Sequence, residues 1–185
     1  MADNEFGYTI WGMDWVRLAE PISLTKPEPL LPRARSIARN GGVETEIENT
    51  MVRATIHRGS EASVTYLEFA PLPSADIRTI AGLVPAGALS LADELHGAIL
   101  GAGVTLAPTL ASVDCSCRAR TERCVHMLAT CYTLARQVDE NPWLALDLRG
   151  YRTGGSAEDP VEVPVSRWTP LDTLDPAAYF DLPAN

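Results

Sequence analysis

The sequence is poor in lysine, in basic charge overall and in long apolar runs. Its basic residues are fourteen arginines and one lysine, acidic residues number 24, and the formal net charge is −9. Nucleic-acid-binding domains are usually basic, because neutralising phosphates supplies much of their affinity, so this balance argues against that class. No run approaches the length of a membrane span, and residues 1–5 are acidic where a signal peptide would be basic. We therefore expect a cytoplasmic protein.

The sequence also lacks the common signatures of catalysis. It contains no glycine-rich phosphate-binding loop and no nucleophile elbow, and its three histidines do not pair recognisably with a nucleophile. We expect a protein that is not an enzyme.

Cysteine and histidine are scarce but concentrated. Three of the four cysteines and one of the three histidines lie within residues 115–126, in the order Cys-x-Cys, six residues, Cys-x-His. Three thiolates and one imidazole form a common closed ligand set for structural zinc. The alternative, a chance cluster of buried residues, explains this spacing poorly. The spacing predicts one zinc ion per chain, held by Cys115, Cys117, Cys124 and His126.

The spacing within each of the two ligand pairs, Cys115 with Cys117 and Cys124 with His126, predicts the local structure that holds it. On an extended segment Cys115 and Cys117 project from the same side and can reach one ion. Residues two apart on a helix diverge, so we expect Cys124 at a helix start and His126 in the first turn, where the helix dipole favours thiolate. Three thiolates and a divalent cation leave one negative charge, which nearby arginines in the connecting loop can offset.

This spacing, followed by an apolar helix, resembles the SWIM zinc finger of chromatin-remodelling ATPases and mobile-element transposases. The similarity to bacterial SWIM proteins extends to Trp11-Gly12-x-x-Trp15, to the segment 139–150 and to the segment 175–180. One departure is Val125, which stands where bacterial members tend to have lysine before the histidine. The resemblance implies a module for DNA or protein contacts, with a helicase-like ATPase as an expected partner.

The rest of the chain predicts an α+β fold with a small antiparallel sheet packed against helices. Residues 43–69 alternate apolar and polar side chains between two turns, which predicts a three-stranded meander with one polar face. Helices are expected over 33–42, over 71–82, from Ser90 to 100 and over the apolar stripe after Cys124. The first of them would end on a glycine pair. A further short helix is expected from Asn141, with Asn141 as the N-cap and Pro142 at the first helical position.

Several residues have an expected place. The tryptophans of segment 6–20 anchor it to the core, the alternative being a platform for stacking bases. His57 and His96 are expected on the surface. Cys131, two helical turns beyond Cys124, is expected to be a buried thiol.

Three regions are expected: 1–113, an α+β region with the tryptophan-rich start; 114–150, the zinc finger and its helices; and 151–185, an extended, acidic, proline-rich tail. The tail still carries Trp168, Tyr179 and Phe180. Aromatic side chains on such a segment are expected to dock on the chain's own surface or on a partner.

These observations favour a non-enzymatic, zinc-binding adaptor, an interaction subunit within a nucleic-acid-handling complex, that uses the acidic sheet, the aromatic tail or both. One alternative is direct DNA or RNA binding through two sets of arginines, namely Arg33, Arg35 and Arg39 near the N-terminus and Arg118, Arg120 and Arg123 in the finger loop. For the first set, a solvated helix face is an equal alternative. A third reading is a redox sensor that releases zinc when Cys115, Cys117 or Cys124 is oxidised.

Overall fold

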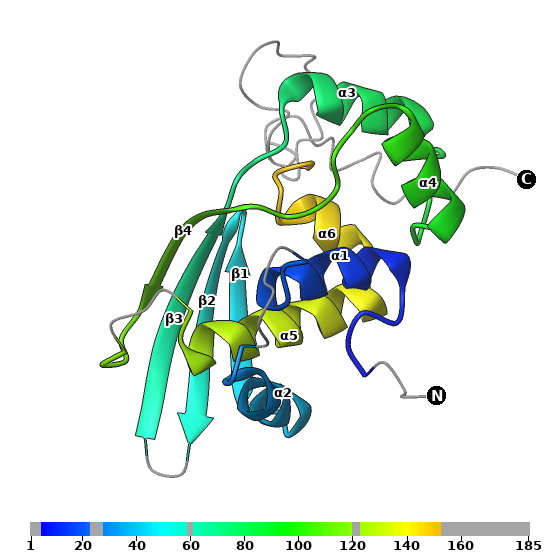
Figure 1. Cartoon of the computed structure of the whole chain (residues 1–185). Coiled ribbons are helices and arrows are strands. Elements are labelled where there is room, and N and C mark those ends of the chain that lie inside the picture. The colour runs from blue at the N-terminus through cyan, green and yellow to red at the C-terminus, as the bar shows by residue number, and fades with distance from the viewer. Residues whose placement is uncertain (1–4, 23–27, 59–60, 120–122, 153–185) are drawn as a thin grey trace, which may run out of the picture.

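The structure is a computed structural model of the 185-residue chain, and it describes residues 5–22, 28–58, 61–119 and 123–152. Within these residues it is an α+β fold, with a four-stranded antiparallel sheet and six helices (Figure 1). The strands are β1 (Val43–Glu48), β2 (Met51–Arg58), β3 (Glu61–Phe69) and β4 (Leu110–Cys115). The helices are α1 (Ile10–Ala19), α2 (Leu31–Arg39), α3 (Ser74–Leu83), α4 (Asp93–Gly101), α5 (Val125–Glu140) and α6 (Trp143–Asp147).

The sheet has the order β1-β2-β3-β4, and each strand pairs antiparallel with the next. The first three strands confirm the predicted meander. Glu48 pairs with Met51, so the β1–β2 turn has two residues, and Asn49 takes a φ of 54°, which asparagine tolerates well. The segment that leads to Cys115 forms β4, a fourth strand beyond the three of the predicted meander. Its pairing with β3 contains a register shift between Glu68 and Phe69, a β-bulge.

In the part of the chain that the structure describes, helices cover one face of the sheet. Helix α5 packs against β1, β3 and β4, and both α1 and α2 pack against α5, on opposite sides of it in Figure 1. The hydrogen bonds between Thr45 of β1 and Gln137 of α5 fix which side of the strand faces the helices. Helices α3 and α4 contact each other, and α4 also contacts α1.

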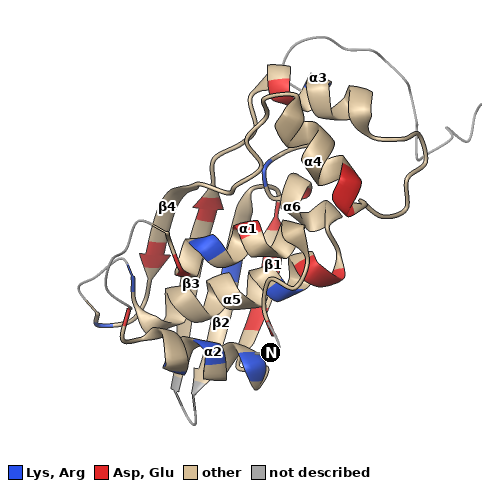
Figure 2. Ribbon diagram, turned by 45° about the vertical axis from the view of Figure 1, so that its right-hand side comes forward, with Lys and Arg blue, Asp and Glu red and all other residues tan. Residues whose placement is uncertain are grey.

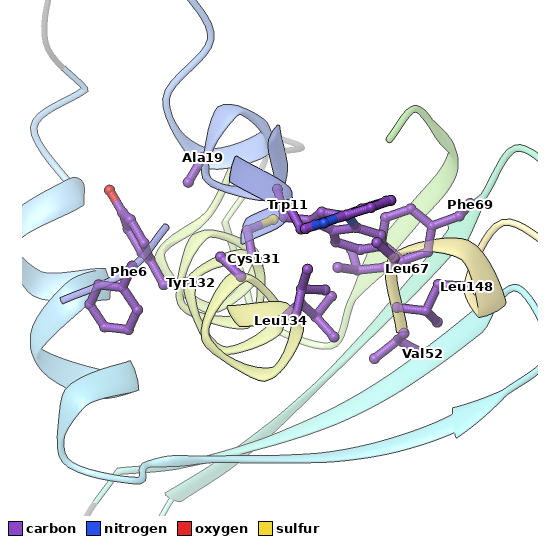
Figure 3. Packing of buried hydrophobic residues seen from close by; sticks show 14 of the residues in the cluster. Phe6, Trp11, Ala19, Val52, Leu67, Phe69, Cys131, Tyr132, Leu134 and Leu148 are labelled. Atoms are coloured by element: carbon purple, nitrogen blue, oxygen red, sulfur yellow. The ribbon is translucent and has the colours of Figure 1, made fainter. Parts of the chain in front are cut away.

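The core lies between the sheet and α1, and α5 runs through it. Trp11 and Trp15 of α1 are 1% and 0% exposed, which confirms that the tryptophans anchor the N-terminal segment. Figure 3 shows Tyr132 near Phe6, and Trp11, Cys131 and Leu134 belong to the same cluster of buried residues as Leu67 and Phe69 of β3. The stripe predicted on α5 is buried throughout, and Cys131 is 0% exposed, as expected for a core thiol.

This core joins segments on both sides of residue 113, which lies within β4. The predicted division into a region before residue 114 and a finger after it stays a prediction. The predicted tail, from residue 153 onward, lies outside the described residues.

Several helix boundaries differ from expectation, including those of the helices expected over 33–42 and 71–82, which span Leu31–Arg39 and Ser74–Leu83. Helix α4 starts at Asp93 with Ala92 as its N-cap, so the start proposed at Ser90 was wrong. Helix α6 starts at Trp143, and Pro142 rather than Asn141 occupies the N-cap position. The left-handed end of α2 was predicted correctly, since Gly41 has a φ of 68° and the Gly42 N–H donates to the Ile37 carbonyl at 3.0 Å.

Candidate metal centre

Two elements bring four metal-ligating side chains together. Strand β4 ends at Cys115, Cys117 follows two residues later, and α5 begins directly after Cys124. The ligand atoms of Cys115, Cys117, Cys124 and His126 all lie within 4.8 Å of one another. The spacing in the sequence thus predicted a cluster that the fold assembles.

The sheet positions the first pair. Cys115 lies opposite Thr65 of β3, and its Sγ accepts a hydrogen bond from the Thr65 hydroxyl at 3.3 Å. The pairing continues one residue further, because the Ser116 N–H donates to the Val64 carbonyl and the Ser116 hydroxyl oxygen accepts from the Val64 N–H, both at 2.9 Å. The extended segment between the two cysteines is therefore held to β3.

The start of α5 positions the second pair. Cys124 is the N-cap, and its Sγ accepts from the Met127 N–H at 3.4 Å. His126 lies in the first turn, with Nδ1 at 3.8 Å from Cys115 Sγ. These are the positions that the sequence analysis predicted.

The donors fit a tetrahedral zinc ion. Zn–S bonds of about 2.3 Å and Zn–N bonds of about 2.0–2.1 Å place sulfur and nitrogen ligands about 3.6 Å apart around the ion. The distance of 3.8 Å between Cys115 Sγ and His126 Nδ1 is close to that value. A metal ion can therefore be held here by these four residues, which supply a complete set of four ligands.

The electrostatics of the thiols indicate why a cation belongs here. Burial raises the pKa of the Cys124 thiol to about 12, whereas the hydrogen bond from the Met127 N–H acts to lower that pKa, which is the direction expected of a helix start. Burial also acts to raise the pKa of Cys115, but hydrogen bonds from Thr65 and Cys117 outweigh it and lower that pKa. Three thiolates this close need a positive charge between them.

Arg123 fastens the metal loop to α1. Its guanidinium donates to the carbonyl oxygens of Leu18 and Ala19, at 3.2 and 2.7 Å. A cation at the carbonyl end of a helix is favourable, because those oxygens carry the negative end of the helix dipole. Arg118 is exposed, and Arg120 lies outside the described residues.

The N-terminal arginines do not form a free basic face. Arg35 pairs with Glu20, and its Nε donates to the Tyr132 hydroxyl at 3.0 Å. Arg39 pairs with Glu5, with its Nε at 2.6 Å from Glu5 Oε1. Arg33 shares α2 with them. Two of the three predicted phosphate contacts are thus engaged by acidic side chains of the same chain.

Two of the buried polar groups that the sequence analysis missed contact α1 or the residues just before it. Asp139 of α5 is 6% exposed and accepts from the Gly7 N–H at 2.7 Å and from the Thr9 N–H and hydroxyl, both at 2.8 Å. It lies four residues after Ala135 on the buried stripe, and this signal in the sequence could have identified it.

The second is a pair between α1 and α4. His96 is 2% exposed, its Nε2 lies 2.9 Å from Asp14 Oδ2, and its ring meets Trp11 edge-on, so the expectation of a surface histidine was wrong. His57 is exposed, as expected.

Trp168, Tyr179 and Phe180 lie outside the described residues. No helix in the part of the chain that the structure describes has the length and apolar character needed to cross a membrane.

The chain is similar to the uncharacterized protein Rv2102 of Mycobacterium tuberculosis, with 31% identity over 156 residues. The match covers 77% of this chain and 55% of that protein, so the chain spans about half the length of the curated relative it matches. No protein-family profile matches the chain, and no solved structure matches it.

Proposed function

We propose that the chain is a SWIM-type zinc-binding adaptor that holds one zinc ion and has no catalytic activity of its own. The observation that carries this proposal is the set of four donors within 4.8 Å of one another, three sulfurs and one imidazole. Zinc is the metal that most often takes this set with tetrahedral geometry, and four protein ligands leave it no open position for a catalytic water.

The proposed role of the metal is to hold the fold. An ion at this centre would connect β4 of the sheet to the first turn of α5, the helix that contacts α1, α2 and the sheet. Arg123, adjacent to the ligand Cys124, extends that connection to the end of α1. The ion would thus stabilise a surface on which a partner can dock, for which a helicase-like ATPase is the class that the SWIM resemblance suggests.

Direct nucleic-acid binding is less well supported. Arg35, Arg39 and Arg123 are each engaged by carboxylates or carbonyls of this chain, and phosphate binding would have to displace those partners. The overall charge of −9 adds repulsion.

Elemental analysis of the purified full chain tests the metal. We expect one zinc per chain, and we expect a strong chelator to remove it and lower the melting temperature. A matched control is Cys131→Ser, which should keep the zinc, because Cys131 belongs to the core and not to the cluster. A different metal, or a chain that melts at the same temperature with and without chelator, would contradict the proposal.

Filter binding to duplex and single-stranded DNA at two salt concentrations tests the adaptor role. We expect little retention at either. Tight binding that weakens steeply with salt, and that is lost in Arg118→Gln, would instead support a nucleic-acid-binding module.

A further inference from the structure

The face of the sheet that points away from α5 carries a distinctive set of side chains. Thr45 is hydrogen-bonded to Gln137 of α5, and side chains alternate along a strand, so Glu44, Glu46 and Glu48 of β1 point to the opposite face. The pairing register extends this outer face across the sheet, because residues directly opposite each other share a face.

The outer face is acidic and open. Its carboxylates outnumber its arginines five to one, and the residues that the register places on it are Glu44, Glu46, Glu48, Met51, Arg53, Thr55, His57, Ala62, Val64, Tyr66, Glu68, Ser112 and Asp114. None of them is buried. Figure 2 shows red segments on β3 and β4, in contrast to the blue segments on α2.

The face also has an apolar and aromatic centre. Tyr66 is 42% exposed and Met51 44% exposed, and Val64 lies next to Tyr66 on the outer face of β3. The single arginine, Arg53, is paired with Glu46 at 2.8 Å and leaves the other acidic side chains in excess. Exposed apolar side chains surrounded by charge of one sign are typical of a surface that binds a protein partner.

We propose that this outer face docks an extended, basic segment of a protein partner, with lysine or arginine at alternate positions. The three glutamates of β1 follow one another at every second residue, so their side chains repeat at about 6.5 Å along the strand. An extended segment repeats its own side chains at the same distance, so alternate basic residues can meet Glu44, Glu46 and Glu48 in turn. The residues between the basic ones face away from the sheet, so contact with Tyr66 needs an aromatic or apolar residue of the partner at a position that faces the sheet.

Electrostatic repulsion argues against a second copy of this chain, a nucleic acid or residues 151–185 as the occupant of the outer face. A second copy of this chain would bring one acidic face against another, and a nucleic acid would bring phosphates. Residues 151–185 contain two basic and six acidic residues, so that segment also carries the wrong sign. A basic protein segment is the occupant whose charge is complementary.

This inference rests on the proposed adaptor function and names the partner's chemistry. A direct test uses the zinc-loaded full chain and a fluorescent ten-residue peptide with lysine alternating with threonine. Two further peptides are a same-composition peptide with its five lysines consecutive and a peptide with glutamate in place of lysine. At low salt we expect the alternating peptide to bind most tightly, and the glutamate peptide not to bind.

The variant that tests the site is the triple substitution Glu44→Gln, Glu46→Gln and Glu48→Gln. We expect its affinity for the alternating peptide to fall at least about tenfold, because charged contacts at a docking surface both speed association of the partner and slow its dissociation. The matched control, Asp93→Asn with Glu94→Gln and Glu140→Gln, removes the same charge from exposed positions on α4 and α5. It should change affinity less than about twofold. Equal losses in both triple variants, or absence of binding by the unaltered chain, would overturn the inference.

A second variant examines the centre of the face. Tyr66→Ala should weaken peptide binding further when one of the sheet-facing lysines of the peptide is replaced by tryptophan, whereas Tyr8→Ala, at an exposed tyrosine before α1, should not. Failure of this inference leaves the zinc content and the DNA result unchanged. Failure of the adaptor proposal would appear in those measurements and not in the comparison of the two triple variants.

Discussion

The two ends of α5 are anchored by different chemistry. At its start lie the N-cap Cys124 and His126 of the first turn. Their ligand atoms lie with those of Cys115 and Cys117 in a cluster that can hold a metal ion. Near its last residue, Asp139 accepts hydrogen bonds from Gly7 and Thr9 at 2.7–2.8 Å. The first anchor has donors that could take up an ion from solution, whereas the second is made entirely by the chain. Metal loss and loss of the N-terminal anchor should therefore be separable by mutation.

Removing a ligand at the first end should have the largest effect. Cys124→Ala leaves three donors, and structural zinc binding can supply on the order of 10 kcal/mol of folding free energy, so we expect loss of zinc and unfolding around α5. Zinc content and the melting curve by circular dichroism measure this. Cys131→Ala, at a buried thiol one turn from Met127, is the control, because it should lower the melting temperature modestly and keep the zinc. Equal zinc content in both variants would contradict a role for Cys124 as a ligand.

Removing the carboxylate at the second end should have the next largest effect. Asp139→Ala leaves the Gly7 and Thr9 N–H groups without their acceptor, and we expect a loss of about 3 kcal/mol in the free energy of unfolding, with zinc content unchanged. Urea denaturation measures the first quantity and elemental analysis the second. Zinc loss in this variant would show that the two ends are not independent.

Gly12→Ala tests the same Asp139 anchor by a substitution on α1. A Cβ at Gly12 would lie 2.1 Å from Asp139 Oδ1, and that carboxylate cannot move without breaking its hydrogen bonds. We expect a loss of about 2 kcal/mol, in the range of overpacking. In the double variant Gly12→Ala, Asp139→Ala the clash is gone, so the cost should be less than the sum of the two single costs. Additive costs would mean that the glycine serves another purpose.

The smallest effect is expected for a substitution of Tyr132, in the middle of α5. Burial, and then the hydrogen bond to Glu20, raise the pKa of the Tyr132 phenol above its ordinary value of 10.0. The folded chain therefore holds this proton more tightly than the unfolded chain does, and the associated stability is complete below pH 10 and decreases as the pH rises further.

Tyr132→Phe should cost about 1 kcal/mol at neutral pH, because it removes hydrogen bonds to Glu20 and Arg35. The difference between the two chains should shrink above about pH 10, measured by urea denaturation at each pH. A difference that stays constant up to pH 11 would contradict the assigned environment of the phenol.

The features predicted correctly depend on short sequence distances. The meander between residues 43 and 69 follows from alternation along adjacent strands, and the metal cluster follows from spacing within twelve residues. The positions of Cys124 and His126 at the start of α5 follow from helix geometry, which a few residues define.

The features missed join distant segments. Asp139 meets Gly7 across 132 residues, and His96 meets Asp14 across 82. Nothing near His96 in the sequence distinguishes a buried histidine from an exposed one, because its acidic partner belongs to another helix. The arginines of α2 were similarly ambiguous, since Glu5 and Glu20 lie on other segments.

The bulge between Glu68 and Phe69 affects how copies of this chain can associate. It interrupts regular pairing beside β4, one border of the sheet, while the other border, β1, carries the row of glutamates. Irregular or charged border strands are poor templates for strand-by-strand growth into fibres. A concentrated solution of the folded chain should accordingly resist polymerising through its sheet margins.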